Sequence, residues 1–205
     1  MSQITTGIRA ILSHPRVYDT LQNIMGAQAV RRDLVDSFIR PQAGCRILDI
    51  GCGTSEILAF LPETVQYWGY DISQSYIEAA RKRFGRHGHF EFRQLDRVEL
   101  EILPRFDVVI ALGVLHHLDD PLVIELFSLA RAALVEGGRV ITIDPCLAPG
   151  QNVVARHLIL RDRGQNVRTK DGYRNLAAGS FSRIDGTLRH RKWIPYTHWI
   201  MECVV

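Results

Sequence analysis

Two glycines and two aspartates near the start of the chain have the spacing of a nucleotide-binding site. In the stretch Ile47-Leu-Asp-Ile-Gly-Cys-Gly53, a short apolar run carrying Asp49 leads into the glycine pair Gly51 and Gly53. Glycine permits a tight turn and lets the backbone approach a ligand closely. Asp71 follows Asp49 after 22 positions, near the offset of about 20 residues at which an acid meets ribose hydroxyls in doubly wound folds. These residues predict a cradle for a nucleotide-type ligand.

Glu56 indicates which nucleotide the cradle would suit. It stands where the dinucleotide fingerprint Gly-x-Gly-x-x-Gly has its third glycine, and a carboxylate there would face the pyrophosphate of NAD or FAD. Asp49 adds a second negative charge. A ligand that carries an amino group and a sulfonium suits this charge better, so a dinucleotide oxidoreductase is the disfavoured alternative.

The stretch Leu48-Asp-Ile-Gly-Cys-Gly-Thr54 resembles motif I of the class I S-adenosylmethionine-dependent methyltransferases of the small-molecule type. The resemblance covers residues 40–145 well and implies S-adenosylmethionine as the cofactor. It implies that Asp71 binds the ribose and that Asp96, after the third expected strand, meets the adenine amine. The remaining cofactor contacts that it implies come from Asp49, Gly51, Gly53, Ile72, Arg97 and Leu112.

His116 and His117 are the candidate catalytic residues. They follow the apolar run 106–115, at a place that resembles family motif IV, whose residues face both the methyl group and the acceptor. An imidazole suits general-base catalysis near neutral pH. Adjacent side chains of an extended segment point in opposite directions, so we expect His116 to face the methyl group and His117 to turn away. A histidine hydrogen-bonded to the lid or to Asp119 for structure is the competing interpretation.

Alternating strands and helices are expected to position these residues. The pattern from 46 to 144 predicts parallel strands with helices on both faces, and 187–194 with 197–204 predict an antiparallel hairpin. The predicted fold class is α/β, a Rossmann-like, seven-stranded methyltransferase sheet that is mostly parallel with an antiparallel C-terminal strand. A ligand of such a sheet lies outside the carboxyl ends of the strands, where Gly51, Asp71, Asp96 and His116 are expected.

We expect one domain over residues 1–205, with two segments that cover the site. Residues 1–40 read as a helical lid whose Tyr18 contacts the cofactor, although helix packing on the sheet is the alternative. Residues 145–169 are longer than a simple crossover needs, and long connections are often functional; we interpret them as a substrate-side insertion. Thr54 or Ser55 is expected to cap the helix that follows the glycine turn.

Charge gives the only indication of the acceptor. From Leu147 onward ten basic side chains oppose four acidic ones, a net charge of +6 within a chain whose total is +3. A solvated basic face is the plain interpretation. The sharper one is a small anionic acceptor guided by Arg161, Arg163 or Arg168. RNA is the competing partner for the same charge, disfavoured because residues 112–115 lack the Asn/Asp-Pro-Pro-aromatic motif of enzymes that methylate base amines.

Several properties complete the expectations. The four cysteines lack metal-binding spacing and are read as reduced, buried thiols, and no metal site is expected. No stretch approaches the length of a membrane span, so a cytoplasmic protein without membrane contact is expected. A non-catalytic S-adenosylmethionine-binding protein remains an alternative, and the oligomeric state stays open.

Overall fold

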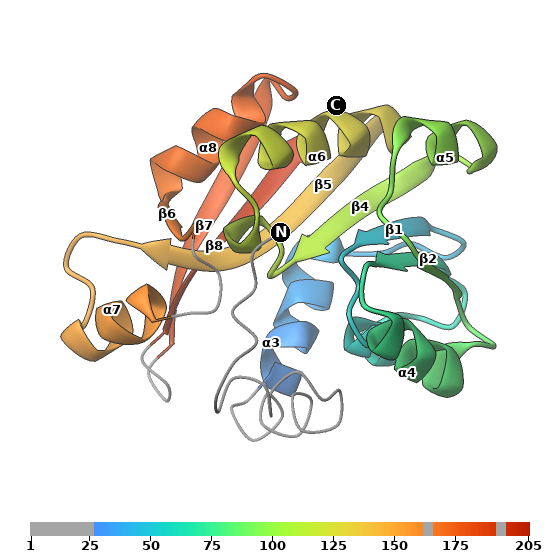
Figure 1. Ribbon diagram of the computed structural model, residues 1–205, viewed down its shortest axis with the longest axis horizontal. Helices are drawn as coiled ribbons and strands as arrows, with labels where there is room; N and C mark the ends of the chain where they lie inside the picture. The colour runs from blue at the N-terminus through green and yellow to red at the C-terminus, as the bar shows by residue number, and fades with distance from the viewer. Residues whose placement is uncertain (1–26, 162–165, 192–195) are drawn as a thin grey trace. The chain divides into compact units, whose positions relative to one another are not determined.

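The computed structural model of the chain describes residues 27–161, 166–191 and 196–205. They fall into two compact units, with the break between Leu95 and Asp96, and each unit is described separately (Figure 1). Tyr18 and the first part of the expected lid lie outside the described residues. The single domain over 1–205 stays a prediction.

The first unit is built on three parallel strands in the order β3-β2-β1. Ile47 and Leu48 of β1 and Tyr67 of β2 are almost fully buried, as expected for strands covered on both faces. The described chain enters through a helix that continues as a single π-helical turn, which confirms the helical pattern expected before residue 40 for residues 27–39 alone. The elements are α3 (Ala27–Leu34), η1 (Val35–Ile39), β1 (Arg46–Ile50), η2 (Glu56–Phe60), β2 (Gln66–Asp71), α4 (Gln74–Phe84) and β3 (His89–Phe92).

The segment after the glycine turn differs from the prediction. Residues Glu56–Phe60 form the short 3₁₀ helix η2, not an α-helix, and no side chain caps it. Ser55, at the N-cap position, has a left-handed backbone with φ of 56°. An N-cap residue normally has an extended backbone that aims its side chain at the first free amides, so the expected cap by Thr54 or Ser55 is wrong.

The second unit holds the remaining strands in the order β4-β5-β8-β7, with β6 pairing β5. β4 runs parallel to β5, whereas β8 runs antiparallel to both of its neighbours, β5 and β7. The elements are α5 (Arg97–Ile102), β4 (Phe106–Leu112), η3 (Leu115–His117), α6 (Asp120–Ala133), β5 (Leu134–Leu147), α7 (Val153–Leu160), β6 (Arg168–Thr169), α8 (Lys170–Ala178), β7 (Arg183–Arg191) and β8 (Tyr196–Val204).

Helices α6 and α8 lie side by side over the strands of this unit (Figure 1). Phe127 of α6 meets Phe181 edge to face, with ring centroids 6.2 Å apart, and both rings are buried. Asp119 caps α6 by accepting a hydrogen bond from the Leu122 amide. Helix α7 lies beyond the carboxyl end of β5 (Figure 1) and buries only Ala155 and Ile159.

The predicted fold class is confirmed: the chain is α/β, mostly parallel, with antiparallel strands at its C-terminal end. One strand was not expected, because β6 has only two residues and so no alternating pattern to find. The four cysteines are free and buried, as expected. No helix within the described ranges is long and apolar enough to cross a membrane.

Candidate functional site

The glycine turn and Asp71 are joined directly in the first unit. Gly51 and Gly53 both have positive φ, 75° and 55°, a region that glycine enters without penalty. The amides of Gly51 and Cys52 donate to the carbonyl of Tyr70, at 2.8 and 3.0 Å. The amide of Gly53 donates to one carboxylate oxygen of Asp71 at 2.9 Å. The glycine turn and Asp71, which the sequence spacing predicted to act together, are therefore joined by hydrogen bonds.

Asp71 also holds the start of the next helix. Its second carboxylate oxygen accepts from the amide of Ser73, the residue before α4, at 2.7 Å. A carboxylate offers about four acceptor positions in all, so the amides of Gly53, Ser73 and Ile72 leave room for a further donor. Burial raises the pKa of Asp71, an effect that the amides of Ser73, Gly53 and Ile72 partly oppose. The half-buried carboxylate can thus serve the turn and accept a hydrogen bond from a ribose as well.

Asp49 is almost fully buried in β1. One of its oxygens accepts from the Tyr67 hydroxyl at 2.5 Å. Its other oxygen is buried without a hydrogen-bond partner among the described residues. Burial, reinforced by the charge of Asp71 and opposed by the Tyr67 hydrogen bond, raises the pKa of the Asp49 carboxyl to about 7. Ionisation of Asp49 in the folded protein therefore has a cost in desolvation free energy. A cationic ligand would offset that cost.

We expect Asp49→Asn to stabilise the ligand-free protein at pH 8. An unfolded chain ionises this carboxyl near pH 4, whereas the folded protein does so near pH 7. The raised pKa means that the folded state of the parent is favoured at low pH and loses this advantage as pH rises from about 4 to about 7, at most about 4 kcal/mol. Asparagine keeps an acceptor for Tyr67 but no charge. Denaturant unfolding of both proteins between pH 5 and 8 measures the difference; parallel curves would contradict it.

Glu56 does not present a free carboxylate. It is buried at the start of η2 and forms an ion pair with Arg83 of α4. The charge argument used against a dinucleotide is therefore wrong as stated, because the Arg83 guanidinium compensates this carboxylate. The Asp49 argument stands independently of it.

Ile72 and Phe92 give the first unit an exposed apolar surface beside Asp71. Ile72 follows Asp71 directly and is 46% exposed, and Phe92, 49% exposed, is the register partner of Asp71 on β3. Exposed aliphatic and aromatic side chains of this kind suit the face of a purine ring. Ile72 was expected at the site. Phe92 was not, although an aromatic residue at the end of a strand is a signal that sequence reasoning can use.

The other residues expected at the cofactor belong to the second unit. Asp96 caps α5 by accepting from the Glu99 amide at 2.8 Å. Arg97 donates to the Ser128 hydroxyl of α6 at 2.9 Å. Leu112 ends β4 and is partly exposed. Their cofactor contacts stay predictions, and Arg97 has a structural partner that the sequence did not indicate.

His116 is bound to an acid that was not among the predicted site residues. Its backbone amide and its ring Nδ1 both approach Oδ1 of Asp144, at 3.1 and 2.8 Å. Asp144 is buried on β5, and burial raises its pKa although the His116 contacts oppose the shift. When Asp144 is ionised it can only accept, so Nδ1 carries the proton and Nε2 is the basic nitrogen. The signal was available: Asp144 is an acid near the end of a buried strand, as Asp49 is.

The two histidine rings do not point in opposite directions. Residues Leu115–His117 form the 3₁₀ helix η3 rather than an extended segment, and the ring centroids of His116 and His117 lie 4.0 Å apart. The expectation failed because it assumed strand geometry. His116 is the more buried of the two, and its acid partner is Asp144 rather than Asp119.

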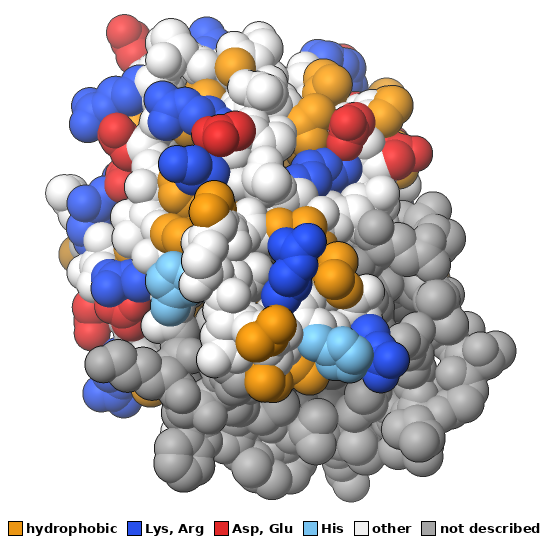
Figure 2. Space-filling view, turned by 90° about the vertical axis from the view of Figure 1, so that its left-hand side faces the viewer, with side chains coloured by type: hydrophobic (Ala, Val, Ile, Leu, Met, Phe, Trp, Pro, Cys, Tyr) orange, Lys and Arg blue, Asp and Glu red, His pale blue; other side chains and the backbone are white. Residues whose placement is uncertain are grey.

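Arg168 is not available to guide an acceptor. Its guanidinium is engaged by Asp120, at 2.6 and 2.9 Å, and by backbone carbonyls, which contradicts one of the three arginines proposed for this role. Arg163 lies outside the described residues. Figure 2 looks onto the side of the molecule that carries α7 and α8, and there basic side chains are interspersed with acidic and hydrophobic ones. Among the residues drawn there in colour, the basic side chains form no single patch.

Comparisons with known proteins identify the family. Residues 48–140 match the family model described as a methyltransferase domain, a span that includes the glycine turn, Asp71 and His116. The fold is similar to that of geranyl diphosphate C-methyltransferase from Streptomyces coelicolor, with a TM-score of 0.65 at 15% identity, over 86% of this chain and 75% of that one. Residues 48–140 are therefore a methyltransferase domain, and the fold agrees with that of the class I S-adenosylmethionine-dependent methyltransferases. This confirms the resemblance found from motif I.

Two curated relatives of this methyltransferase differ in the atom that they are named for. Ubiquinone biosynthesis O-methyltransferase from Brucella anthropi is 33% identical over 162 residues, 71% of this chain and 63% of the relative. Phosphoethanolamine N-methyltransferase 1 from Triticum aestivum is 28% identical over 167 residues, 80% of this chain and 33% of the relative. The chain spans 21% to 54% of the length of the first four curated relatives that it matches.

Proposed function

We propose that the chain transfers a methyl group from S-adenosylmethionine to a proton-bearing group of a small molecule, with His116 as the general base. The observation that carries the proposal is the His116–Asp144 pair, which fixes one ring nitrogen and leaves the other basic. The cofactor half of the proposal rests on the Gly53–Asp71 link.

The residues of the first unit fit the cofactor. Asp71 retains room to accept from a ribose hydroxyl, and the exposed Ile72 and Phe92 suit adenine. The buried, unpartnered oxygen of Asp49 favours a ligand with positive charge. When bound, S-adenosylmethionine supplies an electrophilic methyl group on a sulfonium.

The residues of the second unit fit the acceptor chemistry. Asp144 holds the His116 ring in one orientation and stabilises the imidazolium that forms when Nε2 takes a proton. A nucleophile that must lose a proton, such as a hydroxyl, gains most from this pair. A tertiary amine acceptor, which has no proton to lose, would gain nothing from it. The geometry therefore favours O-methylation or methylation of a protonated amine.

A small molecule is the acceptor class that we propose. With Arg168 engaged internally, an anionic acceptor would depend on Arg161 and Arg163. Helix α7, in the 145–169 insertion, exposes Val153, Val154, Leu158 and Leu160, so an apolar acceptor fits this segment at least as well as an anionic one. RNA, the other partner considered, is not favoured by the face shown in Figure 2, where the described basic side chains are interspersed with acidic ones.

Calorimetry with S-adenosylmethionine, S-adenosylhomocysteine and NADH tests the cofactor half. We expect the first two to bind with dissociation constants on the order of micromolar, about −8 kcal/mol, and NADH to give no heat. Binding of NADH alone would overturn the proposal. Release of S-adenosylhomocysteine with a panel of phenols, carboxylates and primary amines then tests the acceptor half; binding without release for any of them would favour the non-catalytic alternative.

A further inference from the structure

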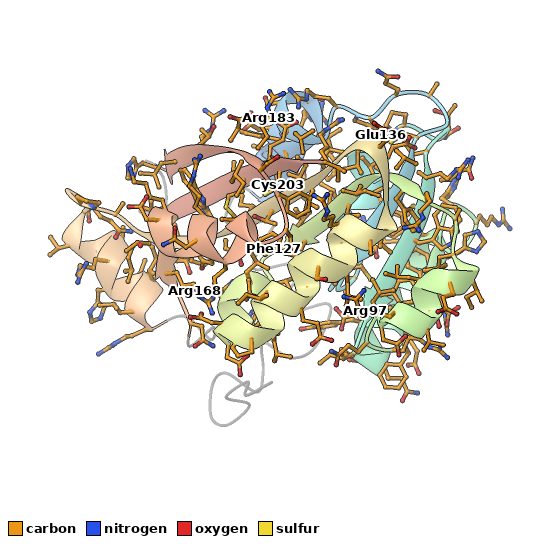
Figure 3. All side chains as sticks on the ribbon, turned by 90° about the horizontal axis from the view of Figure 1, so that it is seen from above. Arg97, Phe127, Glu136, Arg168, Arg183 and Cys203 are labelled. Atoms are coloured by element: carbon orange, nitrogen blue, oxygen red, sulfur yellow. The ribbon has the colours of Figure 1, made fainter. Side chains whose placement is uncertain are left out.

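The guanidinium of Arg168 joins segments that are far apart in the sequence. Its Nη1 donates to the carbonyls of Leu115 and Asn166, at 3.0 and 2.9 Å. Its Nη2 donates to the carbonyl of Leu118 at 2.8 Å, and both Nη2 and Nε donate to one oxygen of Asp120. The side chain is 11% exposed although it carries a charge, and Figure 3 shows it beside the start of α6.

Two of these acceptors belong to the turn that carries the catalytic candidates. Leu115 is the first residue of η3, and Leu118 is the residue after it. The carbonyl between them is also held, because the amide of Asn166 donates to the carbonyl of His116 at 3.0 Å. Residues 166 and 168 therefore bind three carbonyls of η3 and the residue after it, while Asp144 binds the amide and ring of His116 from β5.

Arg168 is itself fixed before it reaches η3. Its backbone belongs to β6 and pairs with Cys146 of β5. The Tyr173 ring of α8 lies 5.7 Å from the guanidinium carbon, and the Tyr173 hydroxyl donates to the carbonyl of Pro145 at 3.0 Å. The same strand, β5, thus supports both Asp144 and the base of the Arg168 side chain.

We propose that Arg168 is a positioning residue for His116. It holds η3 so that Nδ1 of His116 stays on Asp144 and Nε2 stays directed as a base; this role rests on the proposed function of His116. A planar guanidinium is needed because its donors diverge in one plane towards separate acceptors. A lysine ammonium keeps the charge but has its donors on one nitrogen, so it can reach Asp120 or the carbonyls of η3 and cannot span both.

The test uses nuclear magnetic resonance of the ligand-free protein with both histidine and tryptophan labelled with ¹⁵N. We expect Arg168→Lys to speed solvent exchange of the His116 Nδ1 proton by about tenfold or more, the effect of losing one typical hydrogen bond. The indole proton of Trp199, buried in β8 of the same unit, serves as the reference for general loosening and should be unchanged. Arg183→Lys is the matched control, since Arg183 pairs with Asp185 on the surface.

Asp120→Asn keeps an acceptor but removes the charge. It should speed solvent exchange of the His116 Nδ1 proton by less than Arg168→Lys does. It replaces Arg168→Lys if that variant does not fold. An unchanged His116 proton, or equal acceleration of the Trp199 proton, would reduce Arg168 to a purely structural residue and overturn the inference. Affinity for S-adenosylhomocysteine, measured in parallel, should stay within about twofold of the parent. If the parent does not bind S-adenosylhomocysteine, the proposed function is wrong, and the exchange result for His116 still stands.

Discussion

Replacing Asp71 by alanine is expected to weaken S-adenosylmethionine binding by at least about tenfold. Hydrogen bonds to a charged group are worth about 1.5–3 kcal/mol each before desolvation is subtracted, and a ribose hydroxyl would lose its acceptor. The same substitution also releases the amides of Gly53 and Ser73, so some loss of stability is expected too. Calorimetry gives the affinity, and thermal unfolding of the ligand-free protein gives the loss of stability.

A ligand without ribose hydroxyls separates these two effects. The 2′,3′-dideoxy form of S-adenosylhomocysteine should bind the parent more weakly than the full ligand, whereas Asp71→Ala should not distinguish the two ligands. If the variant still prefers the full ligand by the parent's factor, Asp71 serves only the turn and the helix start. Glu63→Ala removes an exposed acid from the same unit and is the control for charge.

The cofactor half of the site was largely predictable because its information is local. Strand, glycine pair and acid follow one another along the chain, and the 22 positions from Asp49 to Asp71 are set by one strand–helix–strand repeat. The element types follow from hydrophobic periodicity in the same way. The prediction that failed there depended on single backbone dihedrals. Ser55 has a left-handed backbone, and a 3₁₀ helix follows where an α-helix was expected. The residue types of Thr54 and Ser55 do not indicate this conformation.

The acceptor half depends on contacts that no local pattern encodes. Asp144 meets His116 across 28 positions, and Arg168 meets Leu115 across 53. Such pairs appear only once β5 and the two-residue β6 are placed. The side-by-side histidines were missed for a related reason, since a three-residue helix is too short to leave a periodic signal. The surplus of positive charge after residue 147 was visible in the sequence. The sequence did not show that the guanidinium of Arg168 binds acceptors within the protein.

His116→Ala is expected to cut turnover by about 10²–10⁴ with the acceptor that supports release of S-adenosylhomocysteine, while cofactor affinity stays nearly intact. The loss should appear in kcat rather than in the KM for S-adenosylmethionine. Turnover of the parent should fall towards acid pH, because a protonated imidazole cannot accept a proton. Asp144→Asn should also lower turnover, since an amide can donate to Nδ1 and thereby favour the tautomer that is protonated on Nε2.

His117→Ala is the matched comparison, because it removes the adjacent ring and leaves the Asp144 contact in place. We expect it to retain far more turnover than His116→Ala. The reverse order would move the base to His117, which is the less buried ring, and would leave His116 as a structural partner of Asp144. Full turnover in both variants would mean that no histidine takes the proton. Catalysis would then consist of aligning the acceptor with the methyl group, and an acceptor that carries no proton would replace the hydroxyl that the His116–Asp144 pair favours.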